Sequence, residues 1–240
     1  MRYFSGLLIC LVMGCGWGVA QEALTAEMVL KKSLAHHDPN GDWASFAHTL
    51  RLRESRPDGS DRLTSLHLDL VTGSFRCESE SDGVRVSREI AGGVVWATLN
   101  GSSQFSEEDA KKHRLGSVAV RFYHNYYLFL YGLPMKIADP GALLAPEVKR
   151  VSFMDKPVLQ LKVTYEPGVG KDTWYFYFDP ESYAVVGCRF YHDEAANDGE
   201  YIVFEGSYRL GAMSLPQHRH WYTNKEGRLL GTDHLVGHDR

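Results

Sequence analysis

Cysteine is scarce in this chain, with four residues among 240. Cys10 and Cys15 fall within the first twenty residues, which leaves Cys77 and Cys188 for the rest of the chain. Two cysteines cannot build the disulfide framework that stabilises many small secreted domains. Both lie in segments with strand character, so two buried thiols and a single disulfide remain as alternatives.

Positive charge and long apolar runs are also limited. The formal net charge is −4, and no stripe of Lys and Arg could neutralise a row of phosphates, so the sequence predicts no nucleic-acid partner. A membrane-spanning helix needs about 20 predominantly apolar residues, and no segment reaches that length without charges. The sequence therefore predicts no transmembrane segment.

Motifs for covalent chemistry are missing. The chain has no Gly-x-Ser-x-Gly turn, and neither Cys77 nor Cys188 lies at a turn or helix start that would lower the pKa of its thiol. The segment Pro167–Asp172 suggests a phosphate-binding loop, but Tyr165 stands where the first Gly is required and Asp172 where Ser or Thr is required. We interpret this segment as a hairpin turn, and we expect neither an enzyme nor a cofactor.

The first twenty residues have the features of a secretory leader. Met1 and Arg2 precede an apolar stretch, and small residues at Gly18 and Ala20 suit cleavage after Ala20. The segment ending at Cys15 loosely resembles a lipobox, so lipidation of Cys15 is an alternative. We predict a signal peptide over residues 1–20, a single mature domain over 21–240, and export to the periplasm or outer envelope.

Hydrophobic periodicity indicates many short strands and few helices. Helices are predicted over residues 25–36 and 118–130, with a further helix start at Ser106. The longer helix shows a dense apolar face of Val118, Phe122, Tyr126, Phe129 and Leu130. Strands are predicted over residues 46–53, 66–70, 75–77, 84–86, 94–97, 158–165, 173–178, 184–191, 200–210, 217–223 and 229–235.

These elements predict a mainly β (α+β) fold. Turns rich in Gly, Pro, Asp and Asn separate consecutive strands, which is typical of antiparallel connections. A long antiparallel sheet twists strongly and curls. We therefore expect a strongly curved half-barrel, with the helices covering its concave face because they are the only long apolar elements available.

Aromatic strands carry the main functional signal. Trp174, Phe176 and Phe178 share one face of a strand, and the neighbouring strand presents a second apolar face. A packed core explains this pattern, and so does a cleft that admits an acyl chain or a similar apolar ligand. For the cleft we predict the lining residues Leu161, Val163, Tyr165, Trp174, Phe176, Phe178, Phe122, Tyr126 and Phe129.

Histidine supplies an alternative. The chain has 11 His, and three ligands from His and carboxylate suffice for a catalytic zinc site. None of the clusters His36-His37-Asp38, His192-Asp193-Glu194 and His218-Arg219-His220 has the i, i+4 spacing of a helical zinc motif, and adjacent residues on a strand point to opposite faces. A metal-dependent envelope hydrolase would draw on His36, His37, Asp38, His192 and Asp193.

Three segments carry a family resemblance: residues 125–136, residues 161–180 and residues 197–202. They resemble a family of secreted bacterial envelope proteins of unknown function, whose fold is similar to that of the lipoprotein carrier LolA. The likeness extends from about Glu27 to Asp233. It implies a half-barrel sheet with helices laid inside and an apolar cleft, which in LolA takes up the acyl chains of lipoproteins. It implies no catalytic residue.

The preferred hypothesis is a non-catalytic binding or carrier protein of the bacterial envelope. Its partner would be a lipid or an acylated protein, held in a cleft between sheet and helices, and envelope partner proteins are possible. The alternatives are the metal-dependent hydrolase and a structural or surface-complex subunit with a filled core.

Overall fold

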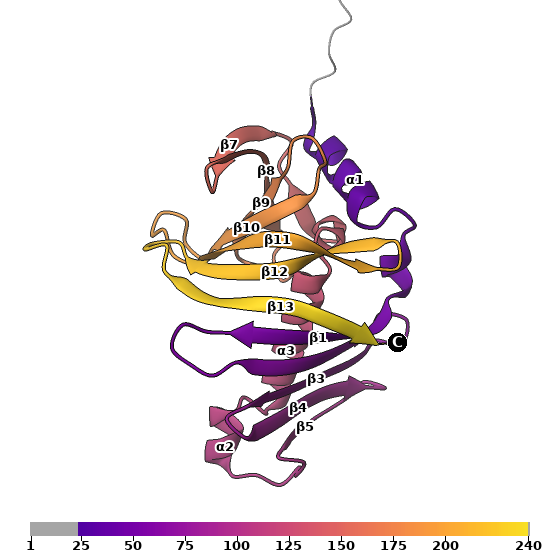
Figure 1. The fold of residues 1–240 in the computed structure, drawn as a ribbon, viewed down its shortest axis with the longest axis vertical. Helices are drawn as coiled ribbons and strands as arrows, with labels where there is room; N and C mark the ends of the chain where they lie inside the picture. The colour runs from indigo at the N-terminus through magenta and orange to yellow at the C-terminus, as the bar shows by residue number, and fades with distance from the viewer. Residues whose placement is uncertain (1–23, 240) are drawn as a thin grey trace, which may run out of the picture.

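The computed structural model describes residues 24–239, and the predicted leader with Cys15 lies outside them. Thirteen strands within this range form one antiparallel sheet in the order β5-β4-β3-β2-β1-β13-β12-β11-β10-β9-β8-β6, with β7 paired to β8. The sheet is curled and unclosed (Figure 1). The predicted half-barrel class is confirmed.

Two meanders meet at the centre of the sheet. The first comprises β1 Ala47–Ser55, β2 Arg62–Asp69, β3 Ser74–Ser81, β4 Val84–Ala91 and β5 Val94–Leu99. The second comprises β6 Ala142–Leu144, β7 Lys149–Phe153, β8 Lys156–Tyr165, β9 Thr173–Phe178, β10 Val185–Tyr191, β11 Glu200–Leu210, β12 Met213–Thr223 and β13 Leu229–Asp239. The pairing of β1 with β13 joins the two meanders into one surface.

Helices occur before and between the meanders. They are α1 Ala26–His37, α2 Glu107–Lys112 and α3 Ser117–Tyr131, with short 3₁₀ turns η1 Asp42–Ser45 and η2 Met135–Ala138. Side-chain oxygens cap two of the helices, because Thr25 accepts from the backbone N–H of Met28 and Ser106 from that of Asp109. No helix within the described residues is long and apolar enough to cross a membrane.

Helix α3 crosses the concave face of the sheet, behind the strands in Figure 1. Its buried residues, Val120, Tyr127, Leu130 and Tyr131, follow helical spacing and belong to the core cluster. Its ring contacts reach β3, β12 and β9 through the pairs His124–Phe75, Tyr126–Trp221 and Phe129–Trp174. A single helix therefore covers both meanders.

The buried face of α3 differs from the prediction. Val118 is 83% exposed and Phe122 is 50% exposed, so the predicted apolar face is wrong at its N-terminal end. The helix carries two stripes of similar periodicity, and the one that contains Tyr127 and Tyr131 faces the sheet. In the core, the hydroxyl group of Tyr127 donates to Glu54 and the ring of Tyr131 packs against the guanidinium group of Arg219.

Other differences concern strand boundaries and the cysteines. The short strands β6 and β7 were not predicted. Strand β12 begins at Met213 and so includes Pro216, whereas the predicted strand begins after this proline, at residue 217. Pro216 is tolerated at this position although proline donates no ladder hydrogen bond. Cys77 and Cys188 are free and buried, the first of the two predicted alternatives.

His37 attaches α1 to the sheet. Its Nδ1 lies 2.5 Å from the carbonyl oxygen of Ser214, and its Nε2 accepts from the backbone N–H of Val185 at 2.9 Å. This pattern requires a neutral ring with the proton on Nδ1. Burial lowers the pKa of His37 to about 4.

We predict that His37→Gln lowers the free energy of unfolding by roughly 1–3 kcal/mol at pH 7.5, since two buried hydrogen bonds are disturbed. Without the substitution, His37 is protonated at a higher pH in the unfolded chain than in the folded chain. The stability contribution of a neutral His37 is therefore lost as pH falls from about 6.5 towards 4. Urea unfolding across this pH range should show that the free energy of unfolding falls less steeply with decreasing pH in the variant. His36→Gln, an exposed neighbour on the same helix, is the control, and an equal change in slope there would contradict the assignment.

Candidate functional site

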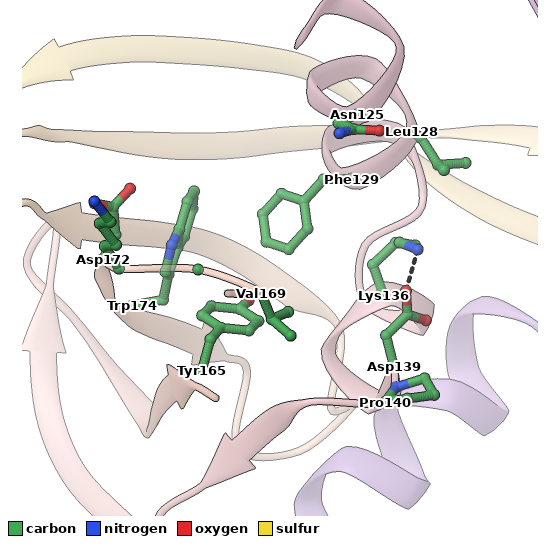
Figure 2. A pocket seen from close by; sticks show the side chains of 12 residues that line it. Asn125, Leu128, Phe129, Lys136, Asp139, Pro140, Tyr165, Val169, Asp172 and Trp174 are labelled. Atoms are coloured by element: carbon green, nitrogen blue, oxygen red, sulfur yellow. Dashed lines mark hydrogen bonds and ion pairs between the residues drawn. The ribbon is translucent and has the colours of Figure 1, made fainter. Parts of the chain in front are cut away.

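A largely apolar cavity lies at the C-terminal end of α3. It has a volume of about 340 Å³ and is bounded by α3, η2, the strands β8 and β9, and the loop between these strands (Figure 2). This volume is at the lower end of the range of about 300–1,000 Å³ for ligand sites. Its lining residues are Asn125, Leu128, Phe129, Lys136, Asp139, Pro140, Tyr165, Val169, Gly170, Lys171, Asp172 and Trp174.

Aromatic rings form the wall of this cavity. Trp174 of β9 contacts Phe129 of α3 edge-on, with ring centroids 4.9 Å apart, and stacks on Phe190 of β10 at 4.8 Å. Figure 2 shows Trp174, Phe129 and Tyr165 around one space. Trp174 and Phe129 are only partly buried, so their rings present apolar surface to the cavity.

The loop over residues 166–172 forms the opposite wall. Gly170 lies so close to Tyr165 that a Cβ there would be 3.0 Å from the ring, which explains the absence of a side chain at this position. Val169 projects beside it and is 57% exposed. The hydroxyl group of Tyr165 is buried with no hydrogen-bond partner among the described residues, and burial raises its pKa.

The charged groups at the rim are mostly paired. Lys136 forms an ion pair with Asp139, three residues later. Asp172 accepts a hydrogen bond from His192 at 2.7 Å, and this bond raises the pKa of His192. Lys171 is exposed and has no ion pair with any described residue. The arrangement has an apolar wall and one available cation at its mouth.

The nine predicted cleft residues are divided among different environments. Phe129, Tyr165 and Trp174 line the cavity. Tyr126 lines a neighbouring cavity and Phe122 is half exposed. The remaining four, Leu161, Val163, Phe176 and Phe178, are completely buried in the core beneath the helix and line no cavity. The buried residues of the predicted set lie further along β8 and β9, whereas Tyr165 and Trp174, near the ends of these strands that flank the connecting loop, line the cavity.

Sequence reasoning missed the loop and helix-end residues, among them Leu128, Val169 and Lys171. One signal was available. Val169 is an apolar residue between two glycines in a turn, where it cannot be buried by its own hairpin. An apolar side chain in that position indicates a surface that contacts a ligand or another part of the fold.

A row of charged side chains crosses the concave face under α3. Four adjacent strands, β12, β13, β1 and β2, place these residues opposite one another in strand register. Arg219 lies opposite Asp233, Asp233 opposite Glu54, and Glu54 opposite Arg62. Glu54 binds Arg62 through two hydrogen bonds of 2.6 Å and also accepts from Tyr127. This row could have been found in the sequence, because Glu54 and Asp233 stand at strand positions where the alternation predicts an apolar residue.

The carboxyl group of Asp233 is buried in the middle of this row. It accepts from the indole N–H of Trp221 at 2.9 Å and lines the cavity next to Tyr126. Burial, and after it the neighbouring charge of Glu54, raises the pKa of Asp233 to about 6.

The residues of the predicted metal site lie apart. His37 is engaged with backbone groups of β10 and β12, whereas His192 is bonded to Asp172. Asp38 accepts from the backbone N–H groups of Asp42 and Trp43, and Asp193 from that of Ala195. Within residues 24–239, no group of three His, Cys, Asp or Glu is arranged to hold a metal ion.

Comparison with solved structures defines the class of fold. A LolA superfamily protein from Nitrosomonas europaea superposes with a TM-score of 0.52 at 14% identity, covering 90% of this chain and 94% of that one. A domain provisionally described as an outer membrane lipoprotein-sorting protein, from Vibrio parahaemolyticus, gives 0.48 at 11% identity over 88% and 90%. A DUF1329 family protein from Desulfovibrio piger gives 0.49 at 10% identity over 88% and 91%. The superposition on the Nitrosomonas europaea protein shows that the fold is LolA-like.

The family follows from a sequence match over nearly the whole chain. Residues 2–238 match the model of the family of unknown function DUF6503. The chain therefore belongs to the DUF6503 family. No curated protein sequence matches it.

We predict that Asp233→Asn stabilises the protein at pH 7.5 by up to about 3 kcal/mol, because the folded chain must ionise a carboxyl group whose pKa is raised by roughly two units. The folded chain binds this proton more tightly than the unfolded chain, so native stability falls as pH rises from about 4 to 6. The gain in the variant should disappear near pH 4. Urea unfolding at both pH values measures this, with Asp58→Asn in an exposed turn as the control. A destabilised Asp233→Asn at pH 7.5 would show that the carboxylate is required by Arg219.

Proposed function

We propose that this protein is a non-catalytic binding or carrier protein of the cell envelope that takes up an acyl chain or a similar apolar ligand in the cavity of Figure 2. The observation that carries the proposal is an aromatic cavity between α3 and the strands β8 and β9, lined by Trp174, Phe129 and Tyr165. It is open at the point where the helix ceases to cover the sheet.

The energetics favour a chain-like apolar ligand. Each buried methylene contributes about 0.8 kcal/mol, so eight methylenes in this cavity would contribute roughly 6 kcal/mol before the cost of ordering. No charge is required for that gain. Lys171 at the mouth is placed to engage a carboxylate group at the end of the chain.

The fold supports the same proposal by analogy. LolA-like half-barrels place helices inside a curved sheet, and the Nitrosomonas europaea protein shares this architecture over 94% of its length. Fold alone does not assign a cargo, so the argument depends on the cavity. The expected partner is a lipid or an acylated protein, and the expected location is the periplasm or the outer envelope after export.

The cavity supports this proposal over a purely structural subunit. A structural subunit needs a filled core, and the four completely buried strand residues do form one. The rings of Trp174 and Phe129 remain partly uncovered next to that core. Apolar surface held open in this way favours a binding role.

We predict that Trp174→Glu abolishes uptake of a fluorescent fatty acid, because a carboxylate inside an apolar cavity carries a large desolvation cost. Trp96→Glu is the matched control, since Trp96 is on β5, away from the cavity, and is 38% exposed. His192→Ala should also leave uptake unchanged. Circular dichroism verifies folding, and a folded Trp174→Glu protein that still binds would remove β9 from the site.

A milder variant tests the mouth of the cavity without disturbing the core. Val169→Glu should weaken fatty-acid binding about tenfold or more, which corresponds to about 1.4 kcal/mol. Val71→Glu makes the same change in another exposed turn and should have no effect. Native mass spectrometry of protein isolated from the envelope should reveal bound lipid. Protein that carries no lipid and binds no fatty acid would contradict the proposed function.

A further inference from the structure

A second cavity of about 350 Å³ lies under the elbow between α2 and α3, against the strands β3 and β4. It is at the opposite end of α3 from the acyl-chain cavity: Tyr123 lines this one, and Phe129, more than a helical turn further on, lines the other. Basic side chains dominate its lining, namely Arg62, Arg88, Lys112, His113 and Arg114. The only carboxylate among its lining residues is that of Asp82.

Most of this positive charge is uncompensated. Arg62 is paired with Glu54. In contrast, Arg88, Lys112 and Arg114 have no carboxylate within ion-pair distance among residues 24–239. Three unpaired cations thus lie around one cavity, opposed by a single exposed carboxylate.

Arg88 is the decisive residue because it is 6% exposed. Its Nε and Nη2 donate to the carbonyl oxygens of Arg114 and His113 at 3.2 and 2.6 Å, and its guanidinium group lies 4.1 Å from the centroid of Tyr123. Carbonyl dipoles and a ring face orient a cation but do not cancel its charge. A buried charge is costly unless an opposite charge compensates it, so this position favours an anion.

A second guanidinium group converges on the same place. Arg114 lies 5.3 Å from the ring centroid of Tyr123 and 5.1 Å from that of Phe122. Its backbone has a φ of 54°, a left-handed conformation that is unfavourable for a residue with a side chain. The elbow thus holds the guanidinium groups of Arg88 and Arg114 against the same ring, that of Tyr123.

We propose that this cavity binds a phosphate group, with Arg88 at its base and Lys112 and Arg114 at its rim. Guanidinium groups match phosphate oxygens through paired N–H donors, and a lysine adds a point charge. The phosphate is carried by a lipid head group or is free in solution. Exposed Phe122 and Val118 lie on the same helix and provide apolar surface for a lipid. The site goes beyond the proposed function, since it shares no residue with the acyl-chain cavity.

The test compares two double variants with equal charge change in the segment formed by α2, the elbow and α3. K112E/R114E reverses two rim cations, whereas K111E/R121E reverses two exposed cations outside the cavity. Isothermal titration with inorganic phosphate measures the free anion, and sedimentation with phosphatidylcholine vesicles containing phosphatidylglycerol measures the lipid. We expect K112E/R114E to weaken binding of the active probe at least about tenfold and K111E/R121E to change it less than about threefold.

The two probes distinguish the source of the phosphate. Binding to the mixed vesicles but not to pure phosphatidylcholine assigns a lipid head group, and binding to inorganic phosphate alone assigns a soluble anion. Arg88→Gln, with folding verified by circular dichroism, should remove binding of the same probe. The proposal is overturned if neither probe binds the native protein, or if both double variants lose binding equally. Fatty-acid uptake is measured in K112E/R114E as well. Uptake that is retained while phosphate binding is lost shows that the two cavities are independent sites.

Discussion

The fold depends on one constraint: a sheet that curls without closing has a concave face that something must cover. Helix α3 covers this face from β3 on one side to β9 on the other, and α1 contributes Ala26, Val29 and Leu30 to the same core. Where α3 lies on the strands, side chains such as Leu161 and Phe176 are completely buried. Where it ends, the sheet is left uncovered and a cavity forms. The position of the candidate site thus follows from the length and placement of this helix.

The helix is also positioned by polar contacts. The charged row of Arg219, Asp233, Glu54 and Arg62 runs across the strands beneath it, and the Tyr127 hydroxyl group donates to Glu54. Arg219 is completely buried, with its guanidinium group 3.9 Å from the ring centroid of Tyr131. Such groups contribute little net stability when paired but are costly when misplaced. They therefore disfavour any shift of α3 along the sheet, which keeps both ends of the helix in place.

Sequence periodicity was sufficient for the class of fold because each meander strand carries its own alternation and its own turn. It located the face containing Trp174 and Tyr165, which do line the cavity. It could not choose between the two apolar stripes of α3, since Phe122 and Tyr127 both satisfy a helical period and only the sheet decides which is buried. It also could not find Val169 or Arg88, whose roles arise from loops and strands distant in sequence.

The pairing of β1 with β13 has a consequence for how the chain acquires its structure. Glu54 lies opposite Asp233 at the centre of the sheet, so the two halves remain separate until residues near 239 have been synthesised. Contacts this distant in sequence form slowly. Until β13 emerges, the β1 edge of the first meander lacks its partner strand, and exposed strand edges and apolar surface favour aggregation.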